Sequence, residues 1–409
     1  FVDCYSQSSN EMDNGGAISL VGFYALSYEM FSGNIFENCS CSRAGGALYV
    51  FCHDKETSSK IIRESDQDQY VIRIFNCNFT KCKSGEEGGA ISSGIIDDQS
   101  HSWGDNDMRL STCHFIECES KKGGAIFFQD GDEDGDEETG ISSCYFTNCY
   151  ASSGEGYAIS CRSYKLTMSY SFFYDHTRTV ESPNGVTPSI VYINMDETAP
   201  MVSDLTFERN PQVSALTIIT KSPTTLERVN FNDYKNGNSA CVNLDEWSVK
   251  GTVTLSEFKF TNIKGCRCIS MNKNSVVAIA QKCTFTNVSL SSEEGDMVQG
   301  QCGSCIFILS TVEIITNNIT VNQCTFTNCG GVGDGGAIYA ELQGIDISGC
   351  KFVNCYSQSP NKMDNGGAVS LVGFNALSYE MFSGNIFENC SCSRAGGALY
   401  VFCHDKETS

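Results

Sequence analysis

Cysteine gives this chain its main potential for covalent chemistry, and the cysteines are regularly spaced. The sequence contains 24 of them. Two cysteines frame a phenylalanine in the pattern C-x-F-x-x-C at five places: Cys77 and Cys82, Cys113 and Cys118, Cys144 and Cys149, Cys324 and Cys329, and Cys350 and Cys355. A structural zinc site needs paired C-x-x-C knuckles, and Cys302 to Cys305 has no partner knuckle. So many cysteines therefore indicate disulfide bonds in an oxidising compartment.

Two pairing schemes are open for these ten framing cysteines. Corresponding segments elsewhere mostly lack both cysteines together, which favours a bond within one segment, across a bend. Such a bond closes a short loop and contributes about 2 kcal/mol. The alternative is a bond between successive segments, because adjacent strands lie about 4.8 Å apart, within the Cα separation that a disulfide tolerates. Ten other cysteines have no assigned partner, although Cys241 and Cys268 occupy equivalent places in adjacent units: Cys39, Cys41, Cys52, Cys161, Cys241, Cys266, Cys268, Cys283, Cys302 and Cys305.

The densest acidic cluster, at 130–138, resembles the start of a calcium-binding loop. Asp130, Asp132 and Asp134, followed by Gly135, supply alternating oxygens as in the first half of an EF-hand loop. The twelfth position is Ile141, so the bidentate glutamate of that loop is missing. We expect a solvated loop with, at most, weak calcium binding, and no other cofactor.

Enzymatic interpretations find little support in the sequence. Asp97 and Asp98 are the nearest approach to the paired carboxylates of a glycosidase, but they lie in a polar segment close to His101. No spacing suggests a Ser/His/Asp or Cys/His arrangement, and the Gly-Gly pairs do not follow a phosphate-binding pattern. We therefore predict that the chain is not an enzyme. A polysaccharide-active enzyme is kept as a remote alternative.

The charge of the chain argues against several classes of partner. The formal net charge is -22 and the pI is near 4.5, which disfavours nucleic acid and anionic membrane surfaces. No apolar run is long enough for a membrane span. Five N-x-S/T sequons favour a secreted glycoprotein: Asn38, Asn78, Asn287, Asn318 and Asn389.

The elements that position these residues are organised by two repeats. Residues 1–58 recur as 352–409 with five differences, at an offset of 351 residues. We therefore expect one full block, 1–351, followed by the start of the next at 352–409, without a true domain boundary. No capping unit is visible at either end, so we expect the protein to continue beyond residues 1 and 409.

A shorter repeat of about 32 residues, 351/11, lies inside the block. F-x-x-N or F-x-N-C phrases alternate with Gly-Gly-Ala-Ile/Leu/Val phrases, which occupy 15–18, 45–48, 88–91, 123–126, 335–338, 366–369 and 396–399. Short alternating runs of Phe, Ile, Val and Thr between Gly, Asn and Asp indicate strands and turns rather than helices. We predict an all-β parallel β-helix of about eleven coils per block, in which phenylalanines stack on one another. The two glycines give a bend that β-carbons would obstruct.

The alternation of GGA[ILV] with FxxN resembles the repeats of chlamydial polymorphic outer membrane proteins and of related trichomonad surface proteins. The resemblance covers nearly the whole chain, most clearly 1–160 and 320–409. It implies a right-handed parallel β-helix that is exposed at a cell surface and used in adhesion. The cysteine density and the long identical repeat depart from what is expected of the bacterial members.

Together these patterns predict an extracellular structural protein, a disulfide-stapled β-helix that forms a cell-surface fibre or filament. Its expected partners are other copies of itself, end to end or laterally, with cell-surface or glycan partners as a further class. The alternative is a surface adhesin for which this β-helix is the stalk.

Overall fold

The computed structural model describes most of the chain: residues 1–6, 13–21, 28–51, 71–93, 107–129, 139–162, 165–178, 188–195, 198–210, 213–220, 222–235, 240–244, 252–271, 277–290, 302–309, 319–341, 345–358, 364–373 and 382–403. No helix is assigned in these ranges, and all strand pairing recorded there is parallel. The chain divides into two compact units, Phe1–Leu205 and Thr206–Ser409.

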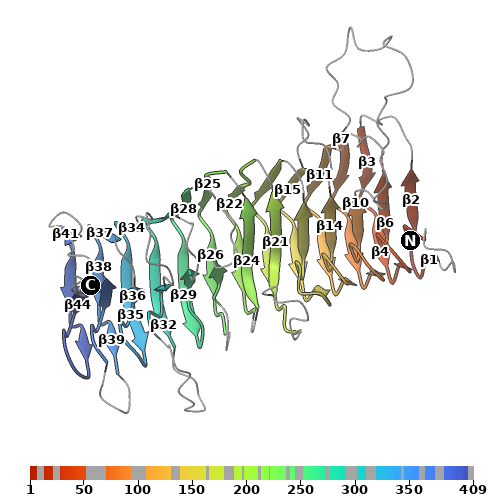
Figure 1. The fold of residues 1–409 in the computed structure, drawn as a ribbon. Coiled ribbons are helices and arrows are strands. Elements are labelled where there is room, and N and C mark those ends of the chain that lie inside the picture. Colours follow the sequence, from red (N-terminus) through yellow and green to blue (C-terminus); the bar gives the residue numbers. More distant parts are fainter. Residues whose placement is uncertain are drawn as a thin grey trace, which may run out of the picture. The chain divides into compact units, whose positions relative to one another are not determined.

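The first unit consists of parallel sheets in which strands from successive coils lie side by side. The sheet that carries the phenylalanine column contains β4 (Ile35–Glu37), β8 (Asn78–Thr80), β12 (His114–Ile116), β16 (Tyr145–Thr147) and β20 (Phe172–Tyr174). The sheet that follows the Gly-Gly bends contains β2 (Ile18–Val21), β6 (Leu48–Phe51), β10 (Ile91–Ser93), β14 (Ile126–Gln129), β18 (Ile159–Arg162) and β21 (Ser189–Met195). In Figure 1, β2, β6, β10 and β14 lie side by side in the order of the chain.

A third sheet of the first unit carries the groove described below. It contains β3 (Tyr28–Ser32), β7 (Val71–Phe75), β11 (Asp107–Ser111), β15 (Thr139–Ser142), β19 (Leu166–Ser169) and β22 (Met201–Ser203). A short fourth ladder joins β1 (Tyr5–Ser6), β5 (Ser40–Cys41), β9 (Lys83–Ser84), β13 (Glu119–Ser120) and β17 (Tyr150–Ala151).

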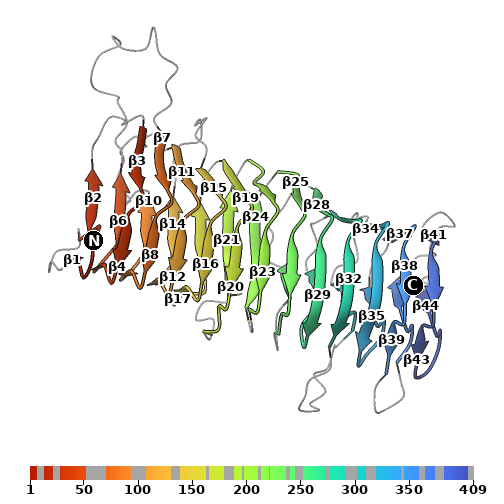
Figure 2. The same cartoon turned by 180° about the vertical axis from the view of Figure 1, so that it is seen from behind.

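The second unit repeats this plan. Its phenylalanine sheet contains β23 (Thr206–Glu208), β26 (Asn230–Asn232), β29 (Lys259–Lys264), β32 (Thr284–Ser289), β35 (Thr325–Gly331), β38 (Lys351–Val353) and β42 (Ile386–Glu388), with β39 (Tyr356–Ser357) pairing both β35 and β43 (Ser391–Cys392). The sheet after the Gly-Gly bends contains β24 (Ser214–Thr220), β27 (Val242–Asn243), β30 (Ile269–Met271), β33 (Ile306–Leu309), β36 (Ile338–Glu341), β40 (Val369–Gly373) and β44 (Leu399–Cys403). The third contains β25 (Thr224–Glu227), β28 (Thr252–Ser256), β31 (Val277–Gln281), β34 (Ile319–Asn322), β37 (Ile345–Ser348) and β41 (Phe382–Ser383). Figure 2 shows β29, β32, β35 and β38 in succession.

The phenylalanine column forms the core of each unit, as predicted. In the first unit the rings of Phe79, Phe115 and Phe146 stack in single file, with centroid separations of 4.9 and 4.8 Å. In the second unit the rings of Phe285 and Phe326 are 4.7 Å apart and nearly parallel. These spacings match the separation of adjacent strands, so register between coils places each ring upon the next. The prediction of an all-β parallel β-helix is confirmed.

The two glycines of the GGA phrase serve different purposes. Gly45 adopts a φ of +69°, a left-handed conformation that residues with a β-carbon rarely adopt. A β-carbon on Gly46 would lie 2.1 Å from the carbonyl oxygen of Gly89 in the next coil. The first glycine therefore permits the bend, and the second lets successive coils approach closely.

The spacing of C-x-F-x-x-C has a backbone explanation that the sequence did not reveal. Asn76 and Lys81, which directly precede Cys77 and Cys82, have φ values of 52° and 53°. The strand of Phe79 is thus bracketed by two left-handed bends, and a buried cysteine follows each of them. The pattern marks the two corners of a coil.

Candidate functional site

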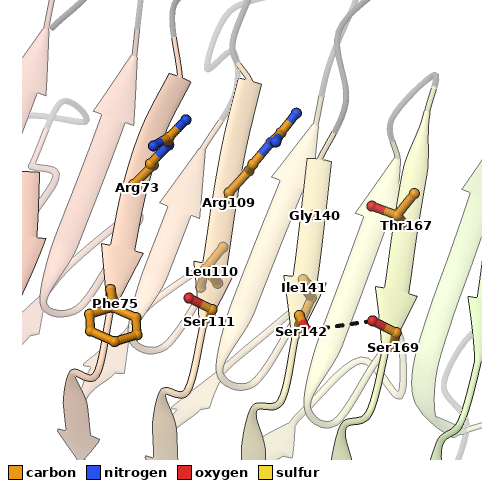
Figure 3. A pocket seen from close by; sticks show the side chains of 10 residues that line it. All are labelled: Arg73, Phe75, Arg109, Leu110, Ser111, Gly140, Ile141, Ser142, Thr167 and Ser169. Carbon is orange, nitrogen blue, oxygen red and sulfur yellow. Dashed lines mark hydrogen bonds between the residues drawn. The ribbon is translucent and has the colours of Figure 1, made fainter. Parts of the chain in front are cut away.

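A shallow groove of about 380 Å³ lies on the outer face of β7, β11, β15 and β19 in the first unit (Figure 3). Strand register arranges its side chains in two rows that cross successive coils. The first row is Arg73, Arg109, Gly140 and Thr167. The second row is Phe75, Ser111, Ser142 and Ser169. The alternation of strand side chains directs both rows outward, while Leu110 and Ile141 between them are buried.

The depth of the groove depends on Gly140. A β-carbon there would lie 3.4 Å from Thr167 Oγ1 and 3.5 Å from Arg109 Cγ. Any larger side chain would therefore fill the hollow between these two residues. Gly140 has a backbone conformation that any residue can adopt. Its effect is therefore to leave space between Arg109 and Thr167.

The groove presents hydrogen-bond donors on a strongly acidic chain. Arg73 and Arg109 are adjacent in register, and both are exposed. Figure 3 shows both guanidinium groups on the same side of the serine row, in which Ser169 Oγ donates to Ser142 Oγ over 3.5 Å. Phe75, 41% exposed, offers an apolar surface at one end. Two acidic residues are neighbours by backbone position: Glu29 is the register partner of Arg73, and Asp107 begins β11.

The side chains of this groove are suited to binding a ligand. Guanidinium groups donate paired hydrogen bonds to carboxylate, sulfate or phosphate, and serine hydroxyls both donate and accept. The ten lining residues include no carboxylate, imidazole or thiol. The lining therefore contains no general acid, general base or nucleophilic thiol. The sequence alone does not indicate the groove, because its arginines are 36 residues apart and only strand register makes them neighbours.

The framing cysteines form columns that cross the coils. In the first unit the thiols of Cys82, Cys118 and Cys149 donate to the carbonyl oxygens of Phe36, Phe79 and Phe115 in the preceding coil, over 3.7, 3.5 and 3.6 Å. In the second unit the thiols of Cys329 and Cys355 donate to the carbonyl oxygens of Phe285 and Phe326 over 3.5 and 3.7 Å. Each thiol therefore satisfies a backbone acceptor of the coil before it.

This geometry favours pairing between coils over pairing within one coil. Cys77 and Cys82 lie on either side of Phe79, and the three strand residues between the two bends span about 10 Å. A disulfide tolerates a Cα separation of no more than about 7 Å. The ten framing cysteines are free thiols in this structure, and their bonding stays a prediction: Cys77, Cys82, Cys113, Cys118, Cys144, Cys149, Cys324, Cys329, Cys350 and Cys355.

Burial and hydrogen bonds between neighbouring thiols suppress the ionisation of Cys113 and Cys118 in the first unit. The hydrogen bond with the Cys144 thiol, together with burial, raises the pKa of Cys113 to about 12. Burial, followed by the hydrogen bond with Cys149, raises the pKa of Cys118 well above its usual value. Because the thiolate is the reactive form, Cys113 and Cys118 are chemically unreactive at neutral pH in the folded chain. In the second unit the hydrogen bond with Cys324 instead lowers the pKa of Cys350.

The structure places four of the five sequon asparagines. Asn38, Asn287 and Asn389 occupy the same left-handed bend after a phenylalanine strand, with φ values of 53°, 56° and 54°, and all three are exposed. Asn287 is part of an asparagine ladder: its Nδ2 donates to Asn262 Oδ1 over 3.1 Å, and its Oδ1 accepts from Asn328 Nδ2 over 3.0 Å. Asn78 is exposed on β8. Glycosylation of these residues stays a prediction.

Several predicted sites lie outside the described residues: Asn318, the calcium candidates Asp130, Asp132 and Asp134, and the carboxylate pair Asp97 and Asp98 with His101. Among the residues that are described, no group of three His, Cys, Asp or Glu side chains is arranged to hold a metal ion. In the same ranges no helix is long and apolar enough to span a membrane.

Comparisons with protein-family models, with curated proteins and with solved structures find no match for this chain. The resemblance to the polymorphic outer membrane protein repeats therefore stays a prediction that rests on the GGA and FxxN phrases.

Proposed function

We propose that this chain is part of an extracellular structural protein whose 351-residue blocks continue end to end as a cell-surface fibre. One observation in the second unit carries the proposal. At the start of the new block, Phe352 stacks on Phe326 at 4.7 Å and on Phe387 at 4.8 Å. β38 pairs in parallel register with β35 before it and with β42 after it. The repeat thus restarts without interrupting the ladder.

The seamless junction supports a rod rather than a string of separate domains. A bead-like array would need an independent core in every block, whereas here the core column crosses the junction. The same junction in every block would give a fibre of constant cross-section and constant axial period. Eleven coils at about 4.8 Å per coil give about 53 Å per block.

Electron microscopy of chains with increasing numbers of blocks tests this function. We expect unbranched rods whose length increases by about 53 Å per added block. Particles that instead resemble flexibly linked beads would contradict the proposal. Fluorescent antibodies against the chain, applied to intact cells, test the extracellular location separately.

The groove of the first unit favours a second candidate function, a surface adhesin. Arg73 and Arg109 provide donors for acidic groups, and Phe75 provides an apolar surface beside them. A glycan or an acidic surface polymer is the class of partner that such a groove suits. Binding of the chain to host or neighbouring cells, lost in the double variant Arg73→Ala/Arg109→Ala with the fold intact, would favour this function over a purely structural one.

A further inference from the structure

A cluster of buried cysteines lies beside the Gly-Gly sheet of the second unit. Cys241, Cys268 and Cys305 replace the alanine of the GGA phrase in three successive coils, because Val242 pairs with Ile269 and Ile269 with Ile306. The predicted equivalence of Cys241 and Cys268 is thereby confirmed. All three residues are fully buried, so the cluster is part of the interior of this unit.

The sulfur of Cys241 contacts Cys266, which lies two residues before Cys268, the register equivalent of Cys241 in the next coil. Cys241 Sγ lies 3.9 Å from Cys266 Sγ, in the next coil. The backbone N–H of Cys241 donates to the carbonyl oxygen of Arg267 over 2.9 Å, which holds the Cys266 segment opposite Cys241. A disulfide bond measures about 2.05 Å between sulfurs. Small rotations of the two side chains therefore close a gap of about 2 Å.

We propose that Cys241 and Cys266 form a disulfide bond that links two successive coils of the second unit. The proposal rests on the extracellular location proposed above, since an oxidising compartment supplies the oxidant. The bond closes a loop of 25 residues, much longer than the loop within one C-x-F-x-x-C segment. In the unfolded-state entropy model a longer loop gives a larger stabilisation.

The bond forms by exchange with an external disulfide, either a small molecule such as oxidised glutathione or an oxidoreductase. The thiolate of one cysteine attacks the external disulfide and releases one external thiol, and the thiolate of the other cysteine then displaces the second external thiol. One S–S bond forms, the two cysteines lose two electrons, and the two released thiols take up the two protons. Burial raises the pKa of Cys241 and blocks access to it, so the exchange precedes closure of this coil.

The sequence allows a direct test of the pairing. Trypsin cleaves after Lys235, Lys250, Lys264, Arg267 and Lys273, so Cys241, Cys266 and Cys268 fall on three separate peptides, 236–250, 265–267 and 268–273. The chain is refolded in a glutathione redox buffer, its free thiols are alkylated in denaturant so that buried thiols also react, and the non-reduced digest is analysed by mass spectrometry. We expect peptide 236–250 linked to peptide 265–267, and release of both on reduction.

Matched variants sharpen the test. Cys266→Ser should abolish the link and leave Cys241 alkylated, whereas the control Cys268→Ser should retain it. If the folded, oxidised wild-type chain shows peptide 236–250 linked to 268–273, or shows Cys241 fully alkylated, the pairing is wrong. This outcome is read from the wild-type chain alone, so it does not depend on whether a variant folds. If the link forms in the refolded chain but is missing from protein isolated from cells, the extracellular proposal fails while the pairing stands.

Discussion

Two coils, one in each unit, fill the same buried positions with different chemistry. Around Phe115 the corner positions hold Cys113 and Cys118, whereas around Phe231 they hold Val229 and Tyr234. All four corner side chains are fully buried. In both coils the buried side-chain donor bonds to a backbone carbonyl oxygen. The Cys118 thiol donates to the carbonyl oxygen of Phe79, and the Tyr234 hydroxyl donates to the carbonyl oxygen of Val213. The corners therefore require filled volume rather than sulfur itself, and a donor that is buried there finds an acceptor.

The aromatic columns differ as well. Phe115 stacks on its neighbours at 4.9 and 4.8 Å, both close to the strand spacing. Phe231 stacks at 5.3 and 4.6 Å, and the tilted ring of Phe258 packs beside it at 6.1 Å. The cysteine-framed column is thus the more regular of the two, while the second contains additional aromatic volume near the core.

The largest expected effect is the loss of a ring from either column. Phe115→Ala should lower the free energy of unfolding by about 5 kcal/mol and Phe231→Ala by about 3 kcal/mol. The cost depends on how far the site can collapse, and Phe258 can fill part of the space left by Phe231, whereas the small thiols beside Phe115 cannot. Urea unfolding of the two variants measures the difference. Equal losses would mean that the packing difference is not energetically important.

The glycine bend gives the next contrast. Gly46→Ala should cost about 3 kcal/mol, because its β-carbon meets a backbone oxygen of the next coil. In the second unit, Arg267→Ala removes a cation–π contact of 3.5 Å with Phe307 and should cost about 1 kcal/mol. The addition of one carbon would thus destabilise more than the loss of a whole side chain. Thermal midpoints of both variants test this order.

A smaller change in stability distinguishes a free thiol from a disulfide bond in the cysteine columns. If Cys113 is a free thiol, Cys113→Val, which copies Val229, should change stability by less than about 1.5 kcal/mol. If Cys113 is bonded, the same substitution under oxidising conditions should cost about 2–4 kcal/mol. Comparison of the wild type and Cys113→Val, with and without a reductant, separates the two cases, because only a bonded cysteine makes the effect depend on the reductant.

A further contrast concerns pH. The pKa of Cys113 is raised in the folded state to about 12, while an unfolded cysteine ionises near pH 8.5. The unfolded state therefore binds fewer protons above that pH, and the contribution of Cys113 to stability should fall as the pH rises from about 8.5 towards 12. The urea midpoint of the wild type should decrease more steeply over this range than that of Cys113→Val. Parallel slopes would show that this thiol does not titrate differently in the two states.

Much of the fold follows from the sequence because it depends on a short repeat. Phe79, Phe115 and Phe146 recur with the coil, and Gly45 and Gly46 mark a bend that other residues would obstruct. Such positions could be recognised one coil at a time. The equivalence of Cys241 and Cys268 was also predictable, because both follow from counting along the same repeat.

Other features depend on side chains that meet only after the coils are stacked. The separation of Cys77 and Cys82 by Phe79 disfavours the pairing that their joint occurrence suggested, since sequence spacing does not give the angle of a bend. The contact between Cys241 and Cys266 is diagonal, so equivalence of position does not predict it. The groove at Arg73 and Arg109 depends on register across coils of different length.

A high-resolution cryo-electron microscopy map of a chain that contains a block junction would show whether the core column crosses that junction. We expect Phe326, Phe352 and Phe387 to stack in one file at 4.7–4.8 Å across it. A break in this file at Phe352, with the next block turned away as a separate domain, would contradict a continuous fibre.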